Sequence, residues 1–212
     1  MSPSYAIQVN VTLVQHFLVS NTFLETIACV QGQAQHLSYH QQRMNRALDK
    51  SNPYNLQELL KVPDTSLLRC RILYSSNTIE ISYLPYAKRN INTLQLIEDN
   101  EINYSHKYAD RTQLDHSFAK RSIADDVLIV KNGFITDTTI ANIAFYDGTQ
   151  WFTPDTPLLE GTTRARLINE KKLTIRAIKV DDIRDFQGFA LLNAMIGFHP
   201  IKNGIILPLK DL

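Results

Sequence analysis

The sequence lacks the long apolar runs and the charge imbalance that mark several classes of protein. No stretch approaches the roughly 18 consecutive apolar residues that a membrane-spanning helix needs. Lysine and arginine total 22 against 21 aspartate and glutamate, so no net positive charge attracts nucleic acid or an anionic membrane. The expected partner is therefore a small molecule or a second copy of the chain.

Cysteine is also scarce. Cys29 and Cys70 are the two cysteines, and they lie in apolar, strand-like surroundings without CxxC spacing. This usage is typical of reduced core thiols in a reducing compartment. The N-terminal segment MSPSYAIQVNVTLVQHFLVS has no lysine or arginine before its short apolar run, so it lacks the charged start of a secretory signal. We therefore expect a cytoplasmic protein that is not exported.

What the chain does contain is enough apolar sequence for a sizeable core, since 44% of its 212 residues are hydrophobic. Strand and helix signals alternate up to Tyr86, which predicts an N-terminal α/β subdomain over residues 1–88. The polar stretch AKRNIN then indicates a linker. Strand formers dominate the rest, which predicts a C-terminal β-rich α/β subdomain over residues 92–212. The predicted fold class is α/β, more closely α+β, with two subdomains.

Two predicted elements bear on function. The segment HLSYHQQRMNRALDK predicts a helix whose apolar face holds Leu37, Met44 and Leu48, while Arg43 leaves that face. In the second half, Asn132-Gly133 and Asp147-Gly148 are strong hairpin signals. They separate DDVLIV, FITDTTIANIAFY and QWFTP, which we predict as three strands of an antiparallel meander.

Lys107 is the first candidate for chemistry. It stands in the polar loop NYSHKYADR between a predicted strand and a predicted helix. An amine with an ordinary pKa near 10.4 is protonated and inert, so a catalytic role requires a site that lowers its pKa. The alternative is a solvated surface charge.

A second candidate is a phosphate-binding helix start. Gly161 precedes a predicted helix whose first turn offers backbone N–H groups and two hydroxyls, from Thr162 and Thr163. The alternative is an ordinary helix cap. Arg43 could pair with a phosphate in bidentate fashion, and its alternative is a solvated helix face.

Asp137 is a third candidate, on the predicted middle strand of the meander. A strand interior is costly for an acid unless the acid faces solvent or a cationic partner such as a protonated ring nitrogen. His36 and His40, spaced i,i+4, could suggest a metal site. Because no third ligand accompanies them, capping and surface roles are favoured and no metal is predicted.

The order of these pieces carries more information than any one of them. Strand-Glu-Thr-Ile, a helix with H-x-x-R, a loop lysine, a G-F-I-T-acid-x-x-x-A-N strand and T-P-x-x-x-x-L-x-G-x-T-R follow one another. This series resembles the class IV pyridoxal-phosphate aminotransferase superfamily, which contains branched-chain and D-amino-acid aminotransferases and aminodeoxychorismate lyases. The resemblance runs from Phe23 to about Ile201. It implies a two-subdomain D-amino-acid aminotransferase-like fold, a homodimer and bound pyridoxal 5'-phosphate.

The resemblance also implies roles for single residues. Lys107 matches the lysine that binds the cofactor covalently, and Arg43 matches the phosphate-binding arginine. Asp137 stands where the family usually has a glutamate against the pyridine nitrogen. The other positions matched to cofactor contacts are Ile140, Ala141, Thr162, Thr163, Asn193 and Ala194.

The spacing of Lys107 and Arg111 looks more like the lyase and D-amino-acid branches. The resemblance therefore implies a 4-amino-4-deoxychorismate lyase-type elimination that gives 4-aminobenzoate, for folate biosynthesis, and pyruvate. The alternatives are an aminotransferase acting on D- or branched-chain amino acids, a cofactor-binding relative with little or no activity, and a binding module without the cofactor. The substrate would be a small amino compound, and Arg69, Arg71 and Arg111 are candidates for binding its carboxylate.

Overall fold

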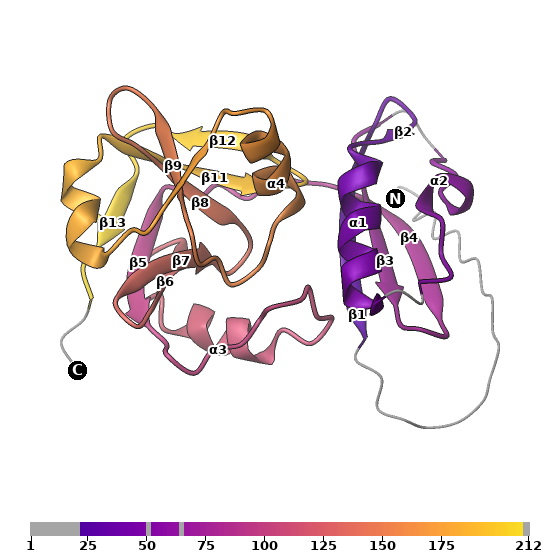
Figure 1. The fold of residues 1–212 in the computed structure, drawn as a ribbon, viewed down its shortest axis with the longest axis horizontal. Coiled ribbons are helices and arrows are strands. Elements are labelled where there is room, and N and C mark those ends of the chain that lie inside the picture. The colour runs from indigo at the N-terminus through magenta and orange to yellow at the C-terminus, as the bar shows by residue number, and fades with distance from the viewer. Residues whose placement is uncertain (1–21, 50–51, 64–65, 210–212) are drawn as a thin grey trace, which may run out of the picture. The chain divides into compact units, whose positions relative to one another are not determined.

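The structure, a computed structural model, describes residues 22–49, 52–63 and 66–209. Spatial contacts divide the chain into two compact units, each of which mixes helices and strands (Figure 1). The first unit contains the chain up to Lys88 together with His106–Asp110. The second contains Arg89–Ser105 and the chain from Arg111 onward. The division into subdomains at residues 1–88 and 92–212 stays a prediction.

The first unit is built on an antiparallel sheet in the order β2-β1-β3-β4. Its strands are β1 (Phe23–Val30), β2 (Gln33–Ala34), β3 (Leu68–Tyr74) and β4 (Ile79–Pro85). Along β3, buried and half-buried residues alternate, which is the pattern of a sheet with one face against a core. The strand of the Glu-Thr-Ile motif, which is β1, is confirmed, as is the alternation of strands and helices up to Tyr86.

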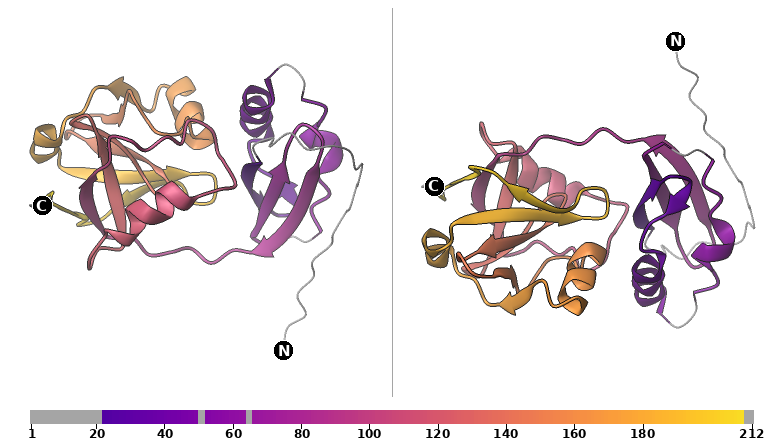
Figure 2. Two further views of the ribbon diagram at one scale, coloured as in Figure 1. Left: turned by 90° about the horizontal axis from the view of Figure 1, so that it is seen from below. Right: turned by 90° about the horizontal axis from the view of Figure 1, so that it is seen from above.

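Two helices cover the core face of this sheet, α1 (Leu37–Ala47) and α2 (Leu56–Leu59) (Figures 1 and 2). Met44 and Leu48 of the predicted apolar face are buried. Arg43 is buried too, because its guanidinium pairs with an acidic side chain of β1, so the alternative of a solvated helix face does not hold for Arg43. The fully buried side chains of this core include Ile27, Cys29, Met44, Cys70 and Ile72.

The His106–Asp110 segment runs along the edge of β1. Leu24 N donates to Lys107 O at 2.7 Å, and Ala109 N donates to Thr22 O at 2.8 Å. Between these bonds, Tyr108 forms an antiparallel bridge with Phe23 and stacks on its ring. These bonds are the reason that Lys107 groups with the first unit.

The second unit is dominated by strands. Its main sheet has the order β10-β9-β8-β7-β6-β5-β13, and β11 pairs with β8 and β12. The strands are β5 (Thr93–Glu98), β6 (Asp126–Lys131), β7 (Phe134–Thr138), β8 (Asn142–Tyr146), β9 (Trp151–Pro154), β10 (Thr174–Arg176), β11 (Gly188–Asn193), β12 (Gly197–Ile201) and β13 (Ile205–Leu207).

One prediction about this sheet is wrong. The segment FITDTTIANIAFY was expected to be a single strand, but it forms two, β7 and β8, with a tight turn between them. Thr138 closes the turn: its hydroxyl accepts N–H bonds from Ile140 and Ala141, and its own N–H donates to Ala141 O. A threonine hydroxyl can in this way form hydrogen bonds with backbone groups that would otherwise pair with a neighbouring strand. The turn pairs Asp137 with Asn142 across the two strands.

The hairpin at Asn132-Gly133 is confirmed, since both residues have positive φ, 52° and 79°, as a two-residue hairpin turn requires. The helical elements of the unit are α3 (Thr112–Ala119), α4 (Thr162–Asn169) and the short 3-10 helix η2 (Val180–Asp185). Buried residues of α4, β8 and β11 form a small apolar cluster, which fixes α4 against the sheet.

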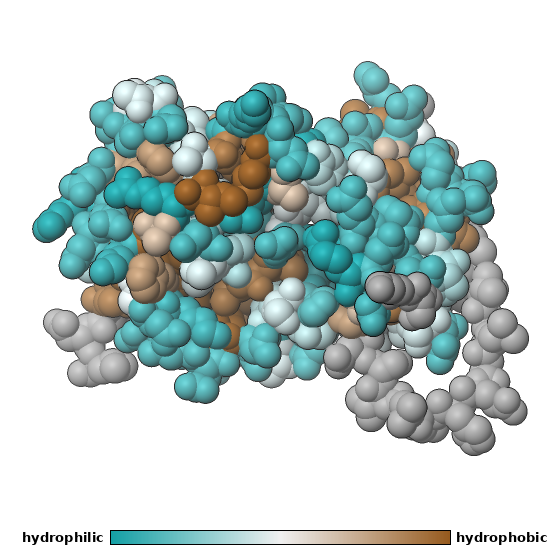
Figure 3. All heavy atoms as spheres, in the orientation of Figure 1, coloured by the Kyte–Doolittle hydropathy of each residue, from teal (hydrophilic) through white to brown (hydrophobic). Residues whose placement is uncertain are grey.

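Most of the face shown in Figure 3 is hydrophilic. No helix in the described ranges has both the length and the apolar character required to cross a membrane. Among those same residues, no group of three or more His, Cys, Asp or Glu side chains could hold a metal ion. Cys29 and Cys70 are both buried and free of disulfide bonds.

Candidate active site

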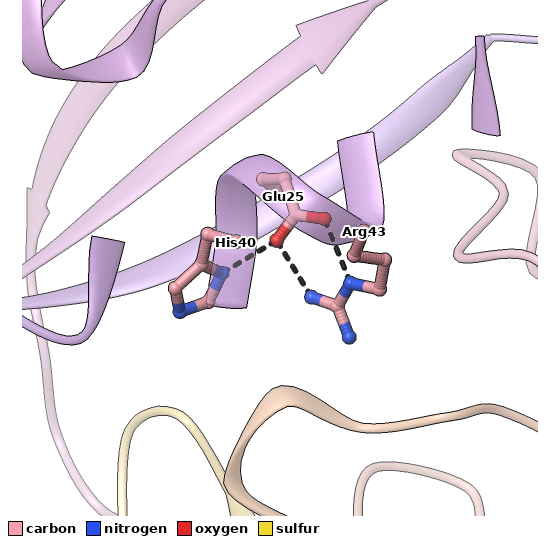
Figure 4. Close-up of polar contacts among 3 residues, drawn as sticks. All are labelled: Glu25, His40 and Arg43. Carbon is pink, nitrogen blue, oxygen red and sulfur yellow. Dashed lines mark hydrogen bonds and ion pairs between the residues drawn. The ribbon is translucent and has the colours of Figure 1, made fainter. Parts of the chain in front are cut away.

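A buried ion-pair network lies in the first unit between β1 and α1. The Glu25 carboxylate accepts hydrogen bonds from Arg43 Nε and Nη2, at 2.7 and 2.6 Å, and contacts His40 Nδ1 at 2.7 Å (Figure 4). His40 and Arg43 are three residues apart, so one turn of helix aims both at the same acid. The H-x-x-R motif and the glutamate of the Glu-Thr-Ile strand are therefore parts of one structure.

The electrostatics of Glu25 are decided by its partners. Complete burial by itself raises the pKa of this carboxyl, but the charge of Arg43 and the hydrogen bonds from Arg43 and His40 outweigh that effect. The pKa of Glu25 is lowered to about 2. Glu25 thus stays ionised over the physiological range, and it holds the Arg43 side chain in one orientation.

Lys107 is half-buried at the edge of the same sheet. The bonds of its segment place Thr22 opposite Ala109, Phe23 opposite Tyr108 and Leu24 opposite Lys107. Side chains alternate between the two faces of a strand. Because Phe23 and Tyr108 point into the core, Lys107 points to the face of Leu24, away from α1.

The second unit contains another buried acid, Asp137 at the end of β7. It is 4% exposed. Its Oδ1 accepts from Asn142 Nδ2 at 2.8 Å, and its Oδ2 accepts from Leu159 N at 2.9 Å. Both donors are neutral. Burial therefore raises the pKa of Asp137 to about 6, against the smaller opposing effects of those hydrogen bonds and of the Arg164 charge.

Asn142 connects this acid to the start of α4. Its Nδ2 also donates to Leu159 O at 2.8 Å, so both amide hydrogens are used. A Cβ placed on Gly161 would overlap the Asn142 Oδ1 atom. Gly161 has φ −70°, a conformation open to other residues, so close packing rather than backbone conformation requires glycine here.

The first turn of α4 presents the predicted phosphate-binding residues. Thr162 and Thr163 are buried, at 6% and 4% exposure, and Gly161 precedes them without a side-chain cap. The first N–H groups of a helix have no partner within the helix. Arg164 does not extend into solvent, since it donates to Pro154 O at 2.7 Å and to Thr153 Oγ1 at 3.3 Å.

The remaining predicted contacts meet at the β7–β8 turn. Asn193, the last residue of β11, donates from Nδ2 to Ile140 O at 3.2 Å. Its Oδ1 accepts the N–H groups of Met195 and Ile196, which forms the turn that contains Ala194. Asn193 therefore ties that turn to Ile140 and Ala141.

The structure brings Asp137, Ile140, Ala141, Asn193 and Ala194 together around the β7–β8 turn. Hydrogen bonds of Leu159 to Asp137 and Asn142 connect this turn to the segment that precedes Thr162 and Thr163. Arg43 and Lys107 belong to the first unit. Sequence reasoning missed Asn142 and Arg164, included Glu25 only as part of a motif, and considered His40 for a metal site rather than as a partner of Glu25. The asparagine of the A-N pair was the signal that could have identified Asn142.

Comparison with known proteins decides the family. The model of the amino-transferase class IV family matches residues 22–203, nearly all of the described chain. The chain belongs to this family. The resemblance inferred from the motif order is confirmed, and so is the prediction that the chain is an enzyme of this class.

This class IV family member is 39% identical over 182 residues to an uncharacterised protein of Haemophilus influenzae, which covers 82% of this chain and 97% of the relative. It is 34% identical to a proposed 4-amino-4-deoxychorismate lyase of Haemophilus somnus of known crystal structure. That match has a TM-score of 0.78 and covers 85% of this chain and 100% of the other.

A more distant match is a hypothetical aminotransferase of Mycobacterium tuberculosis in its pyridoxal-phosphate-bound form. The two are 17% identical with a TM-score of 0.68, and the match covers 90% of this chain and 84% of the other. At this identity the match shows the fold alone. The predicted two-part α/β fold of the family is confirmed.

Proposed function

We propose that the protein binds pyridoxal 5'-phosphate, attached covalently to Lys107, and acts on a small amino substrate. The observation that carries the proposal is the environment of Asp137. This buried carboxyl has neutral hydrogen-bond donors and a pKa raised to about 6. Each oxygen accepts one N–H bond, whereas a carboxylate offers about four lone-pair sites. A cationic N–H group, such as a protonated pyridine nitrogen, fits this site in both charge and hydrogen bonding.

The start of α4 supports the same cofactor. Its buried first turn offers the N–H groups and hydroxyls of Thr162 and Thr163, and the positive end of the helix dipole favours an anion. We assign the phosphate to this turn and to Arg43, whose guanidinium Glu25 orients. The contacts of the ring are assigned to Ile140, Ala141, Asn193 and Ala194.

When bound, pyridoxal phosphate supplies an electron sink for negative charge that develops on the substrate carbon. Asp137 holds the proton on the ring nitrogen. Lys107 would accept the proton from the substrate carbon that carries the amino group. Lys107 and Asp137 thus have separate tasks, proton transfer and charge stabilisation.

The proposed reaction is the elimination of pyruvate from 4-amino-4-deoxychorismate. The proton leaves the amino-bearing carbon, the carbon–oxygen bond to the enolpyruvyl group breaks, and protonation of the released enol gives pyruvate beside 4-aminobenzoate. The 34% identity to the proposed lyase of Haemophilus somnus over its whole length supports this choice. Aminotransfer is the second candidate, because the family is named for it and Lys107 would remove the same proton.

The cofactor assignment is tested by adding pyridoxal phosphate, recording the visible absorption and reducing with borohydride. Mass mapping then locates the attached group. We expect a yellow protein with the label on Lys107, and a colourless Lys107→Ala variant. Lys171→Ala, at an exposed lysine after α4, is the matched control and stays yellow. A label on another lysine, or a wild-type protein without colour, refutes the proposal.

The choice of reaction is tested on protein that was incubated with pyridoxal phosphate and not treated with borohydride. Formation of 4-aminobenzoate and pyruvate in equal amounts supports the lyase. Transfer of the amino group to a 2-oxo acid, without release of 4-aminobenzoate, supports the aminotransferase. Cofactor uptake with neither reaction would identify a binding relative of little activity. We also propose a cytoplasmic homodimer, for which light scattering gives the mass.

A further inference from the structure

One face of the first unit's sheet carries two arginines that the proposed chemistry does not use. Arg69 and Arg71 lie on β3, one of the two inner strands of the sheet, two residues apart and therefore on the same face. Leu68, Cys70 and Ile72 alternate with them and form the opposite face, which packs against α1 and α2. The side chains of Arg69 and Arg71 therefore lie on the face of the sheet that α1 and α2 do not cover.

Neither arginine has a charge partner among the residues that the structure describes. Both are half-buried, and their side chains make no hydrogen bond or ion pair within the described ranges. Arg69 Nε is shielded from solvent and has no acceptor there. Partly buried charges without counterions are costly to keep. Arg43 of the same unit is fully paired with Glu25, so the lack of partners is specific to this face.

The neighbours of Arg71 are suited to an anion. Thr26 on β1 and Ser82 on β4 lie directly opposite it on either side. The nearest acid on this face of the sheet is Glu80, which is exposed and lies opposite Leu73, one step further along. The Ser82 hydroxyl donates to Arg71 O at 3.4 Å, so Thr26 is the hydroxyl neighbour left for a ligand. Two guanidinium groups are a favourable site for carboxylates, since guanidinium binds them through two parallel hydrogen bonds.

The register of the sheet places Lys107 on this same face. Lys107 lies opposite Leu24 of β1, and Leu24 lies opposite Leu73 of β3, two residues from Arg71. Two strand spacings, about 10 Å, therefore separate the Lys107 backbone from β3. A lysine and an arginine side chain can span that distance with a small ligand between them.

We infer that Arg69 and Arg71 bind the carboxylates of the substrate, and that the substrate class is a small dicarboxylate. The inference rests on the proposed function in taking Lys107 as the reactive lysine. Arg111, the third candidate for this role, is engaged elsewhere: its Nη2 donates to Thr139 O at 3.0 Å, and its Nε lies 3.7 Å from Asp115.

The test is titration calorimetry with chorismate on the protein incubated with pyridoxal phosphate. Chorismate carries two carboxylates and no amine, so it reports on anion binding without attachment to the cofactor. We expect Arg71→Gln and Arg69→Gln each to weaken chorismate binding about tenfold or more, as the loss of a charge-assisted pair does. Arg46→Gln, at an exposed arginine of α1, is the matched control and leaves binding unchanged.

Equal chorismate affinity in the wild type and the two variants overturns the inference, as does a wild type that takes the label on Lys107 but binds no chorismate. Inorganic phosphate that displaces chorismate at equal concentration overturns the assignment to carboxylates. If Lys107 takes no label while binding still depends on the arginines, the proposed function fails and the anion site stands.

Thermal unfolding separates a binding role from a structural one. If the arginines serve a ligand, Arg69→Gln and Arg71→Gln leave the melting temperature of the ligand-free protein unchanged or raise it, because an uncompensated charge is removed. Chorismate then stabilises the wild type more than either variant. A lowered melting temperature in the free variants would assign the arginines to the stability of the sheet and overturn the inference.

Discussion

Each unit buries carboxylates, and the contrast between Glu25 of the first unit and Asp137 of the second separates stability from function. Glu25 of the first unit faces a cation and an imidazole, and its pKa is lowered to about 2. Asp137 of the second unit faces two neutral donors, and its pKa is raised to about 6. Burial acts in the same direction on both, so the charge of the neighbours decides the outcome.

The difference shows which acid has an incomplete environment. Glu25 is already neutralised, and removing it would leave the Arg43 charge buried without a partner. Asp137 has hydrogen bonds but no close cation, since Arg164 directs its guanidinium to Pro154 O and Thr153 Oγ1. An acid of the second kind is a candidate for function, because a ligand can supply the missing charge.

The largest expected effect is on catalysis. Asp137→Asn removes the charge that would hold the ring proton, and we expect the turnover rate to fall by about a hundredfold to ten-thousandfold. Steady-state assays of pyruvate release measure it. Asp137→Glu, which introduces the residue usual in the family, is the control and should keep most of the activity. An Asp137→Asn variant as active as the wild type would remove the contrast between the two acids.

A comparably large effect is expected on stability from Glu25→Gln. Breaking a buried ion pair from one side typically costs about 3–5 kcal/mol. Urea unfolding measures the change. Glu170→Gln, which breaks the exposed contacts of Glu170 to Arg166 and Lys172, is the matched control and should change stability little. Similar stability losses in the two variants would show that Glu25 is an ordinary ion pair.

The two acids should also give stability opposite dependences on pH. The pKa of Glu25 falls from 4.5 to about 2 on folding, so its contribution is complete above pH 4.5 and is lost as the pH falls toward 2. The pKa of Asp137 rises from 3.8 to about 6, so its contribution is complete below pH 3.8 and is lost as the pH rises toward 6.

Each of these pH effects is of order 3 kcal/mol, since one pKa unit corresponds to about 1.4 kcal/mol. The measurement is the unfolding free energy of the wild type minus that of Glu25→Gln, and minus that of Asp137→Asn, across the acid range. Differences that change with pH in the same direction for both residues would contradict the opposite environments of the two acids.

The smallest expected effect sharpens the account of the Asp137 site. Gly161→Ala would push its methyl group against Asn142 Oδ1 and disturb the Asn142 bond to Asp137. We expect a loss of about 1–3 kcal/mol in unfolding free energy and weaker cofactor binding. Gly188→Ala is the matched control, because nothing lies within 4 Å of its added methyl group. Equal losses of unfolding free energy in the two variants would mean that close packing does not require glycine at position 161.

The order of motifs along the chain was sufficient to identify the family, because each motif consists of a few neighbouring residues that can be recognised in the sequence. The turn between β7 and β8 was not predictable from the period, since FITDTTIANIAFY reads as one run of strand formers. The turn forms because the Thr138 hydroxyl accepts hydrogen bonds from two backbone N–H groups. Strand propensity does not take such side-chain hydrogen bonds into account.

Arg43 illustrates the same limit on the helical side. Helical periodicity placed it outside the apolar face, and taken alone that inference was reasonable. The strand that packs on α1 carries Glu25 at the facing position, so the arginine is buried with a partner that lies 18 residues away. A periodicity argument considers one element at a time, whereas ion pairing depends on two.

The sequence by itself determined the family, most of the strand and helix segments, and the identity of the candidate lysine and acid. Tertiary structure decided the environments: which acid meets a cation, which face of the sheet carries Lys107, and why position 161 is glycine. The physical reason is that turn hydrogen bonds and the periodic spacing of apolar residues depend on residues that are close together in the sequence. Burial, charge pairing and steric overlap join residues that the chain keeps far apart.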